Sequence, residues 1–207
     1  DIKAVIFDLD GVVTVSERAM TPVVRLIAKE FELEEQKVVD AYEEINDQLD
    51  TNKLDLAQAA EALSEKLGVA VREDHFTSGY EETPIDTDML KIIDALRKGG
   101  VKTALLTNNS RHRFDLLENK HHLMKHFDAL SLSADIGHIK GKTGDVNLFA
   151  DAIKQLHVKA EDCIYIDNNQ DFLETPEDMG LHVYYFDHSL RDFMAFKIYL
   201  SGFGLSA

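Results

Sequence analysis

Short apolar runs and amphipathic stretches follow one another along this chain, and they predict most of its secondary structure. The first run, AVIFDL at residues 4–9, is rich in β-branched residues and leads into Gly11, which is typical of a buried strand before a turn. Residues 21–69 then carry apolar positions at spacings of three and four, which predict helices, and include no convincing strand. We therefore expect a helical insert directly after the first strand.

From residue 86 onward, helical and strand-like segments alternate. The predicted strands span residues 101–108, 129–135, 163–167 and 182–187, and the predicted helices span 89–100, 114–123, 147–158 and 171–180. Such alternation implies right-handed crossovers and a parallel sheet that is covered on both faces. The predicted fold class is α/β: a three-layer Rossmann-like sandwich with a parallel sheet, plus a small helical cap domain.

The change in pattern also predicts two domains. Residues 1–14 and 85–207 would form the Rossmann-like core, and residues 15–84 would form the helical cap. A chain of 207 residues can bury one sizeable core and a smaller satellite domain. The aromatic tail FMAFKIYLSGFG at 193–204 is expected to pack on the core, with a dimer or partner surface as the alternative.

Charge and composition narrow the classes of function. The chain has 38 acidic and 22 basic residues, a formal net charge of -16, which argues against nucleic-acid binding because that role needs a basic surface. The sequence has no apolar run of membrane-spanning length, and its single cysteine suits a reducing compartment. We expect a cytoplasmic monomer or homodimer with no nucleic-acid or membrane partner.

Polar groups that suit phosphoryl transfer follow three of the predicted strands. Asp8 and Asp10 share one face of the first strand end, so one carboxylate could attack phosphorus while the other moves a proton. Thr107, in LLTNNS, offers a hydroxyl beside backbone amides that could bind phosphate oxygens. Asp167 ends the run CIYID and adds a third carboxylate. Ligands bind at this edge of a parallel sheet, and oxygen ligands suit Mg²⁺.

Several of these segments, in this order, resemble the motifs of the haloacid dehalogenase-like (HAD) hydrolase superfamily. The segments are FDLDGVV, LLTNNS, CIYIDNNQDFLETPEDMG and, before the family lysine, FDALSLSADIG. The resemblance covers nearly the whole chain, and a helical cap after the first motif matches the phosphatase type of this family. It implies a Mg²⁺-dependent phosphatase that acts on a small phosphorylated metabolite through an aspartyl-phosphate intermediate.

The resemblance also implies a role for each site residue. Asp8 would be the nucleophile and a magnesium ligand. Asp10 would be the general acid/base and would give the metal its backbone carbonyl. Thr107 and the amide of Asn108 would hold the phosphoryl group, and Asp167 would anchor magnesium.

The stretch HIKGKTGDVNLF departs from the family pattern and leaves two candidates for the catalytic lysine. Counting forward from Ser133 and Gly137 selects Lys140, whereas counting back from Phe149 comes closer to Lys142. We favour Lys140, because the upstream spacing crosses a strand end and is the firmer guide.

The fourth motif departs at one position, where Asn168 follows Asp167 in place of a second acid. Asn168 could bind magnesium through its amide oxygen, or Asp171 could act through water. In the insert, the polar loop that holds Asn52 and Lys53 could contact the leaving group, or could only connect two helices.

The sequence also bears on other activities that share this fold. Dehalogenases of the family lack the second aspartate of the first motif, so Asp10 argues against that chemistry. Related mutases carry a histidine just after the first motif, and VVTVSERAM has none. A sugar-phosphate mutase and a degenerate, non-catalytic binding or regulatory protein remain the alternatives.

Overall fold

A five-stranded parallel sheet forms the centre of the protein in the computed structural model, which describes residues 1–141 and 143–207. The strands are β1 (Ala4–Phe7), β2 (Lys102–Thr107), β3 (Ala129–Leu132), β4 (Cys163–Asp167) and β5 (His182–Tyr185). Their spatial order is β3-β2-β1-β4-β5, and every pairing is parallel. The predicted parallel sheet is confirmed, and the carboxyl ends of β2, β1 and β4 lie side by side at its middle.

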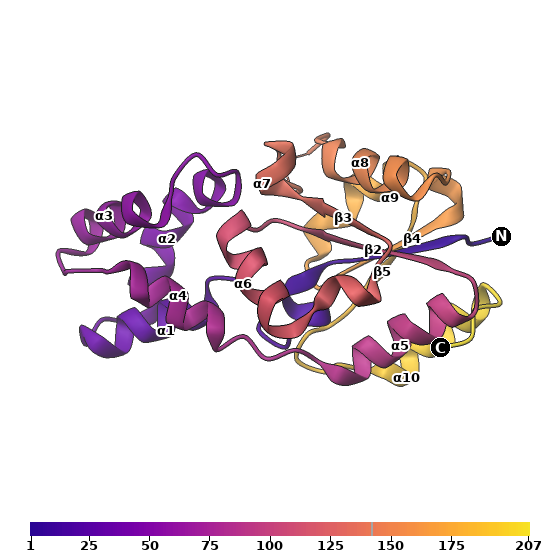
Figure 1. Cartoon of the computed structure of the whole chain (residues 1–207), viewed down its shortest axis with the longest axis horizontal. Helices are drawn as coiled ribbons and strands as arrows, with labels where there is room; N and C mark the ends of the chain where they lie inside the picture. Colours follow the sequence, from indigo (N-terminus) through magenta and orange to yellow (C-terminus); the bar gives the residue numbers. More distant parts are fainter. Residues whose placement is uncertain (142) are drawn as a thin grey trace.

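Helices cover both faces of the sheet and complete the three predicted layers (Figure 1). Helices α5 (Thr87–Lys98), α6 (Arg111–His121) and α10 (Phe193–Gly202) pack on one face; α8 (Asn147–Leu156) covers the other, with α9 (Glu174–Asp178) beside it. Residues of β1 alternate between the two layers: Val5 and Phe7 join the first apolar cluster, and Ala4 and Ile6 join the second. All four side chains are fully buried, as expected for a central parallel strand.

Four helices form a separate group at one end of the molecule, and we call residues 15–84 the helical insert (Figure 1). They are α1 (Thr21–Glu30), α2 (Glu35–Asp50), α3 (Leu56–Leu67) and α4 (Glu73–Glu81). Their apolar faces bury one another in a cluster distinct from the two beside the sheet. Helix α3 has clear end signals, a capping box at Asp55 and the left-handed Gly68.

The two segments that connect the helical insert to the sheet run side by side. Thr14 and Ile85 form an isolated antiparallel bridge, and the backbone N–H of Asp86 donates to the carbonyl of Val13 at 2.9 Å. Arg191, which precedes α10, donates to the Asp86 carboxylate at 2.6 Å. The insert is therefore attached at one place, close to the carboxyl end of β1.

The aromatic C-terminal helix packs on the core, as predicted. Phe196 and Leu200 of α10 are fully buried in the cluster beneath the sheet, whereas Met194 and Ile198 are exposed. Among the described helices, including this one, none is both long and apolar enough to cross a membrane.

Candidate active site

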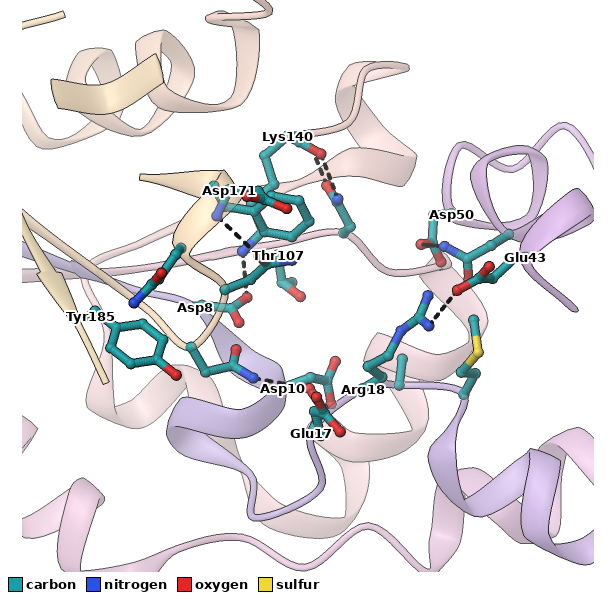
Figure 2. A pocket seen from close by; sticks show the side chains of 18 residues that line it. Asp8, Asp10, Glu17, Arg18, Glu43, Asp50, Thr107, Lys140, Asp171 and Tyr185 are labelled. Atoms are coloured by element: carbon teal, nitrogen blue, oxygen red, sulfur yellow. Dashed lines mark hydrogen bonds and ion pairs between the residues drawn. The ribbon is translucent and has the colours of Figure 1, made fainter. Parts of the chain in front are cut away.

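The predicted site residues converge on a pocket of about 670 Å³ between the sheet edge and the helical insert (Figure 2). The pocket is lined by five of the six predicted residues, Asp8, Asp10, Thr107, Asn108 and Lys140. Asp167 is fully buried beside them and contacts Lys140. The structure thus brings together residues from the ends of three strands and from the loop before α8, as expected for the carboxyl edge of a parallel sheet.

A glycine after the first strand allows the Asp8 loop to turn at the sheet edge. The backbone N–H of Asp8 donates to Ile166 of β4 at 2.9 Å. Gly11 has a φ of 86°, and a Cβ at this position would lie 2.2 Å from Nδ2 of Asn168. Glycine alone easily tolerates both this positive φ and the lack of space for a Cβ. Gly11 therefore allows the first and fourth motifs to contact each other.

Lys140 lies at the centre of the charged groups. It is 3% exposed, and its Nζ donates to Asp8 Oδ1 at 2.6 Å, to Asp167 Oδ2 at 2.7 Å and to the Tyr165 hydroxyl at 2.8 Å. Burial acts to lower the pKa of Lys140, but the charges of Asp167 and Asp8 and the hydrogen bonds to them together raise it. Lys140 is therefore charged between two carboxylates. The other candidate, Lys142, lies outside the described residues.

Asn108 has a structural role that the sequence did not reveal. Its side chain donates to the Lys140 carbonyl at 3.0 Å and accepts from the Lys140 backbone N–H at 3.0 Å. Gly141 has a φ of 98°, and a Cβ there would lie 2.2 Å from the ring of Phe172. The Lys140 ammonium lies 5.3 Å from the centre of that ring. These contacts fix the backbone on either side of Lys140 and aim its side chain at Asp8.

The buried acids outnumber the ammonium that neutralises them. Burial, followed by the charge of Asp167, raises the pKa of Asp8 well above its usual range, although Lys140 acts to lower it. Asp167 also accepts from the Tyr165 hydroxyl and, at 2.9 Å, from the backbone N–H of Asn169. The raised pKa of Asp8 therefore reflects its burial first and the neighbouring negative charge second.

These oxygen atoms fit a hard divalent cation such as Mg²⁺. Asp8 and Asp167 supply carboxylates, Asp10 a backbone carbonyl, and Asn168 an amide oxygen at the pocket wall. The described residues contain no group of three or more His, Cys, Asp or Glu side chains placed to bind a metal. Magnesium needs only one or two carboxylates, because it keeps several waters, and the two carboxylates of Asp8 and Asp167 share a single ammonium, which favours a cation here.

Two functional neighbours, Asn109 and Arg113, were missed by the sequence analysis. Asn109 Nδ2 donates to Thr107 Oγ1 at 2.7 Å and to Asp10 Oδ2 at 3.0 Å, so it joins the second motif to the first. Arg113 pairs with Asp10 and is 1% exposed. One signal was available: Arg113 occupies a core-facing position of α6, next to the buried Phe114.

Helix α2 lines the insert side of the pocket with Glu43, Asn46 and Asp50, next to residues 17–20 at the start of the insert. Burial raises the pKa of Asp50 to about 7, against the lowering effect of the Arg113 charge. The loop residues Asn52 and Lys53 do not line this pocket, and Asn52 accepts instead from the Arg111 backbone at 3.3 Å. In this structure, the last turns of α2 approach the pocket in place of the loop.

The fold and the site together define a Rossmann-like enzyme with carboxylates at the carboxyl edge of its sheet and a helical insert after the first strand. A family model described as haloacid dehalogenase-like hydrolase matches residues 2–173. The chain therefore belongs to this family of hydrolases, as the motifs predicted.

Solved structures of the family share the fold. A HAD-family enzyme from Bacteroides thetaiotaomicron, in a magnesium complex, superposes with a TM-score of 0.73 at 16% identity, over 89% of this chain and 92% of that one. A HAD-like hydrolase from Porphyromonas gingivalis gives 0.71 at 19% identity, over 96% and 98%. The L-2-haloacid dehalogenase of Xanthobacter autotrophicus gives 0.64 at 17% identity, over 88% and 76%. At these identities, the likeness shows the fold alone.

One curated relative is similar in sequence over half of the chain. Bifunctional epoxide hydrolase 2 of Mus musculus is 29% identical over 110 residues, which are 51% of this chain. The match spans only 19% of the mouse protein. The activity in that protein's name is therefore not carried over to this chain.

Proposed function

We propose that this chain is a Mg²⁺-dependent phosphatase that hydrolyses a small phosphorylated metabolite through an aspartyl-phosphate on Asp8. The observation that supports this proposal most strongly is the position of Lys140 Nζ, 2.6 Å from Asp8 and 2.7 Å from Asp167. Asp10 and Thr107 line the same pocket. This arrangement combines a carboxylate nucleophile with neutralising charge, which are the main demands of phosphoryl transfer.

In the proposed reaction, a carboxylate oxygen of Asp8 attacks phosphorus, and the bond from phosphorus to the leaving-group oxygen breaks. Asp10 gives its proton to that oxygen and then takes one from the water that attacks the phosphorus of the aspartyl-phosphate. The bond from the Asp8 oxygen to phosphorus breaks in this second step, which releases inorganic phosphate and restores the Asp8 carboxylate. Lys140, the Thr107 hydroxyl and the Asn108 backbone N–H hold the phosphoryl oxygens. Bound magnesium, held by Asp8, Asp167 and the Asp10 carbonyl, would neutralise charge on the phosphoryl group.

The test is hydrolysis of p-nitrophenyl phosphate by the purified chain. We expect turnover with Mg²⁺, loss of turnover with EDTA, and recovery when Mg²⁺ is added in excess. Because dehalogenases share the fold, chloride release from 2-chloropropionate is measured in parallel and is expected to be absent. Chloride release without phosphate release would replace this proposal with a dehalogenase. Failure to hydrolyse any of a panel of phosphomonoesters would favour a non-catalytic protein.

The charges around the pocket support a narrower class of substrate. Its described lining carries six acids, Asp8, Asp10, Glu17, Glu43, Asp50 and Asp171, against two cations, Arg18 and Lys140. Both cations are already paired, Arg18 with Glu43 at 2.7 Å and Lys140 with Asp8. A second anionic group on the substrate would find no unpaired cation in this lining. The proposed leaving group is therefore uncharged or cationic, with hydroxyl or amine donors for the carboxylates.

A matched pair of substrates tests this charge preference. Glycerol 3-phosphate and 3-phosphoglycerate differ by one terminal group, a hydroxymethyl in the first and a carboxylate in the second. Because like charges placed together cost several kcal/mol, kcat/KM should be at least about tenfold higher for glycerol 3-phosphate. Asp50→Asn should reduce this ratio. If the wild-type enzyme shows an equal or reversed preference, the proposal that the leaving group is uncharged or cationic is contradicted.

A further inference from the structure

Arg113 is a buried charge that the proposed reaction does not use. It lies on α6, is 1% exposed, and sits beside the apolar Phe114 and Leu117 on the core side of that helix. Taking a guanidinium out of water is costly unless another charge pairs with it. The partner of Arg113 therefore indicates what this residue does.

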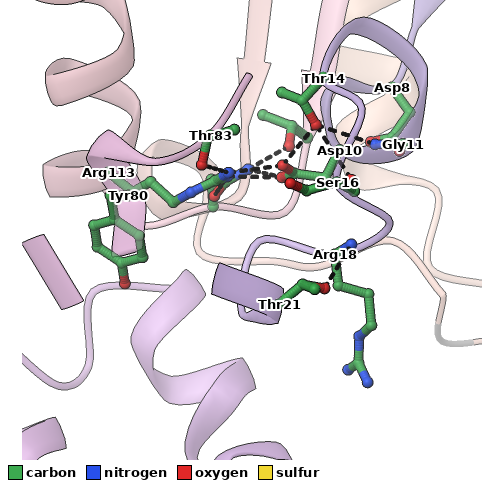
Figure 3. Close-up of polar contacts among 12 residues, drawn as sticks. Asp8, Asp10, Gly11, Thr14, Ser16, Arg18, Thr21, Tyr80, Thr83 and Arg113 are labelled. Atoms are coloured by element: carbon green, nitrogen blue, oxygen red, sulfur yellow. Dashed lines mark hydrogen bonds and ion pairs between the residues drawn. The ribbon is translucent and has the colours of Figure 1, made fainter. Parts of the chain in front are cut away.

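That partner is Asp10, to which Arg113 binds through two parallel hydrogen bonds (Figure 3). Nη1 donates to Oδ2 and Nη2 donates to Oδ1, each at 2.7 Å. A fork of this kind fixes both the distance and the plane of the carboxylate, which a single contact cannot do.

The other contacts of Asp10 complete this orientation. Asn109 Nδ2 donates to Oδ2 at 3.0 Å, and the Thr14 hydroxyl donates to Oδ1 at 3.3 Å. Arg113 Nη1 also donates to Asn109 Oδ1 at 2.7 Å, so one guanidinium orients Asp10 and also the amide that contacts Thr107. Of the four bonds to the carboxylate, the one from Thr14 is the longest, and a leaving-group oxygen would most easily replace it.

A purely structural role for Arg113, in which it links the helical insert to the core, explains its contacts less well. Among the described residues of the insert, Arg113 has a 3.3 Å bond to Thr83 Oγ1, a 5.6 Å approach to the ring of Tyr80, and a charge interaction with Asp50. Its Nε is buried and has no hydrogen-bond partner among the described residues. Buried ion pairs stabilise proteins poorly, and an apolar side chain could fill this space. The two short bonds instead go to the residue proposed as acid/base.

We propose that Arg113 is a positioning residue that holds the Asp10 carboxylate in the plane from which it serves the leaving group. This inference rests on the phosphatase proposed above. Arg113 does not contact the substrate, so its loss acts through Asp10 and affects kcat more than KM.

The test compares Arg113→Met and Arg113→Lys with wild type on p-nitrophenyl phosphate and on an alkyl phosphate. Loss of alignment costs up to about 10²-fold in rate, and the alkyl substrate should lose more because its poor leaving group needs the acid. We expect KM to change less than about twofold and Arg113→Lys to recover only part of the alkyl rate, since an ammonium cannot form the fork.

A double-mutant cycle with Asp10→Asn separates positioning from structure. With Asp10 already replaced, Arg113→Met should cause no further loss of kcat. The double variant also removes both buried charges together, so it provides a folded comparison if Arg113→Met alone is unstable. Thr83→Val is the matched control: it removes the bond to the insert, leaves Asp10 paired, and should keep wild-type kcat.

Three results would overturn the assignment of Arg113. They are equal losses on both substrates, an Arg113→Met effect that persists in the Asp10→Asn background, and a Thr83→Val loss as large as that of Arg113→Met. A wild-type enzyme that hydrolyses no phosphomonoester would instead overturn the proposed function, before the cycle is measured.

Discussion

Asp8→Asn should abolish phosphatase turnover, with a loss on the order of 10⁴-fold or more, because an amide cannot attack phosphorus. The fold should persist. Burial and the charge of Asp167 raise the pKa of Asp8, so its ionised form costs stability at every pH above its unfolded-state value. Asparagine cannot ionise and does not incur this cost, so the melting temperature at pH 7.5 should be unchanged or higher. Turnover of p-nitrophenyl phosphate and thermal unfolding by circular dichroism check both parts.

The control for Asp8→Asn is the same substitution at Asp88, an exposed residue of α5 that pairs with Lys91. Asp88→Asn should retain full activity and a near-native melting temperature, since exposed pairs contribute little. Hydrolysis at the wild-type rate by Asp8→Asn would remove Asp8 from the role of nucleophile.

Lys140→Met should lower both activity and stability. Without the Lys140 ammonium, the negative charge on the phosphoryl group loses this neutralising group. We therefore expect turnover to fall by about 10²–10³-fold. The variant also leaves Asp8 and Asp167 buried without their counter-charge. Breaking a buried pair costs about 3–5 kcal/mol, and each kcal/mol lowers the melting temperature by about 2–4 °C in a protein of this size. The same assay and melting curve measure both effects.

Two companion variants sharpen the Lys140 experiment. In Asp8→Asn/Lys140→Met, much of the lost stability should return, because one buried carboxylate is removed together with the ammonium. Lys142→Met should behave like wild type. If Lys142→Met loses phosphatase activity and Lys140→Met retains it, the upstream spacing selected the wrong lysine.

The fold was predictable because its signals are local and agree with one another. The apolar run at Ala4–Phe7 and the alternation from residue 86 onward specify buried strands and crossover helices, and the sheet follows from their order. The segment from Ser133 to Lys140, which begins with the short helix α7 (Ser133–Ile136), carries a signal of spacing as well. Its spacing after β3 selected Lys140, which the structure places on Asp8.

Long-range pairings were not predictable from the chain. Arg113 and Asp10 are separated by 103 residues, and the position of Arg113 beside Phe114 on α6 does not indicate which residue it pairs with. Likewise, the sequence leaves open whether the loop at Asn52 reaches the leaving group, and the packing of α2 brings Asp50 to the pocket instead. Tertiary packing decides such positions, and sequence periodicity reports only which face of a helix is apolar.

Capture of the covalent intermediate tests the central claim most directly. The enzyme is mixed with Mg²⁺ and a rapidly hydrolysed phosphomonoester, quenched in acid within one turnover, and digested for mass spectrometry. We predict a phosphoryl group on the peptide that contains Asp8, located on Asp8 itself and absent from Asp8→Asn. A phosphoryl group on another residue, or turnover with no phosphorylated peptide in a quench that traps a known aspartyl-phosphate, would contradict the account.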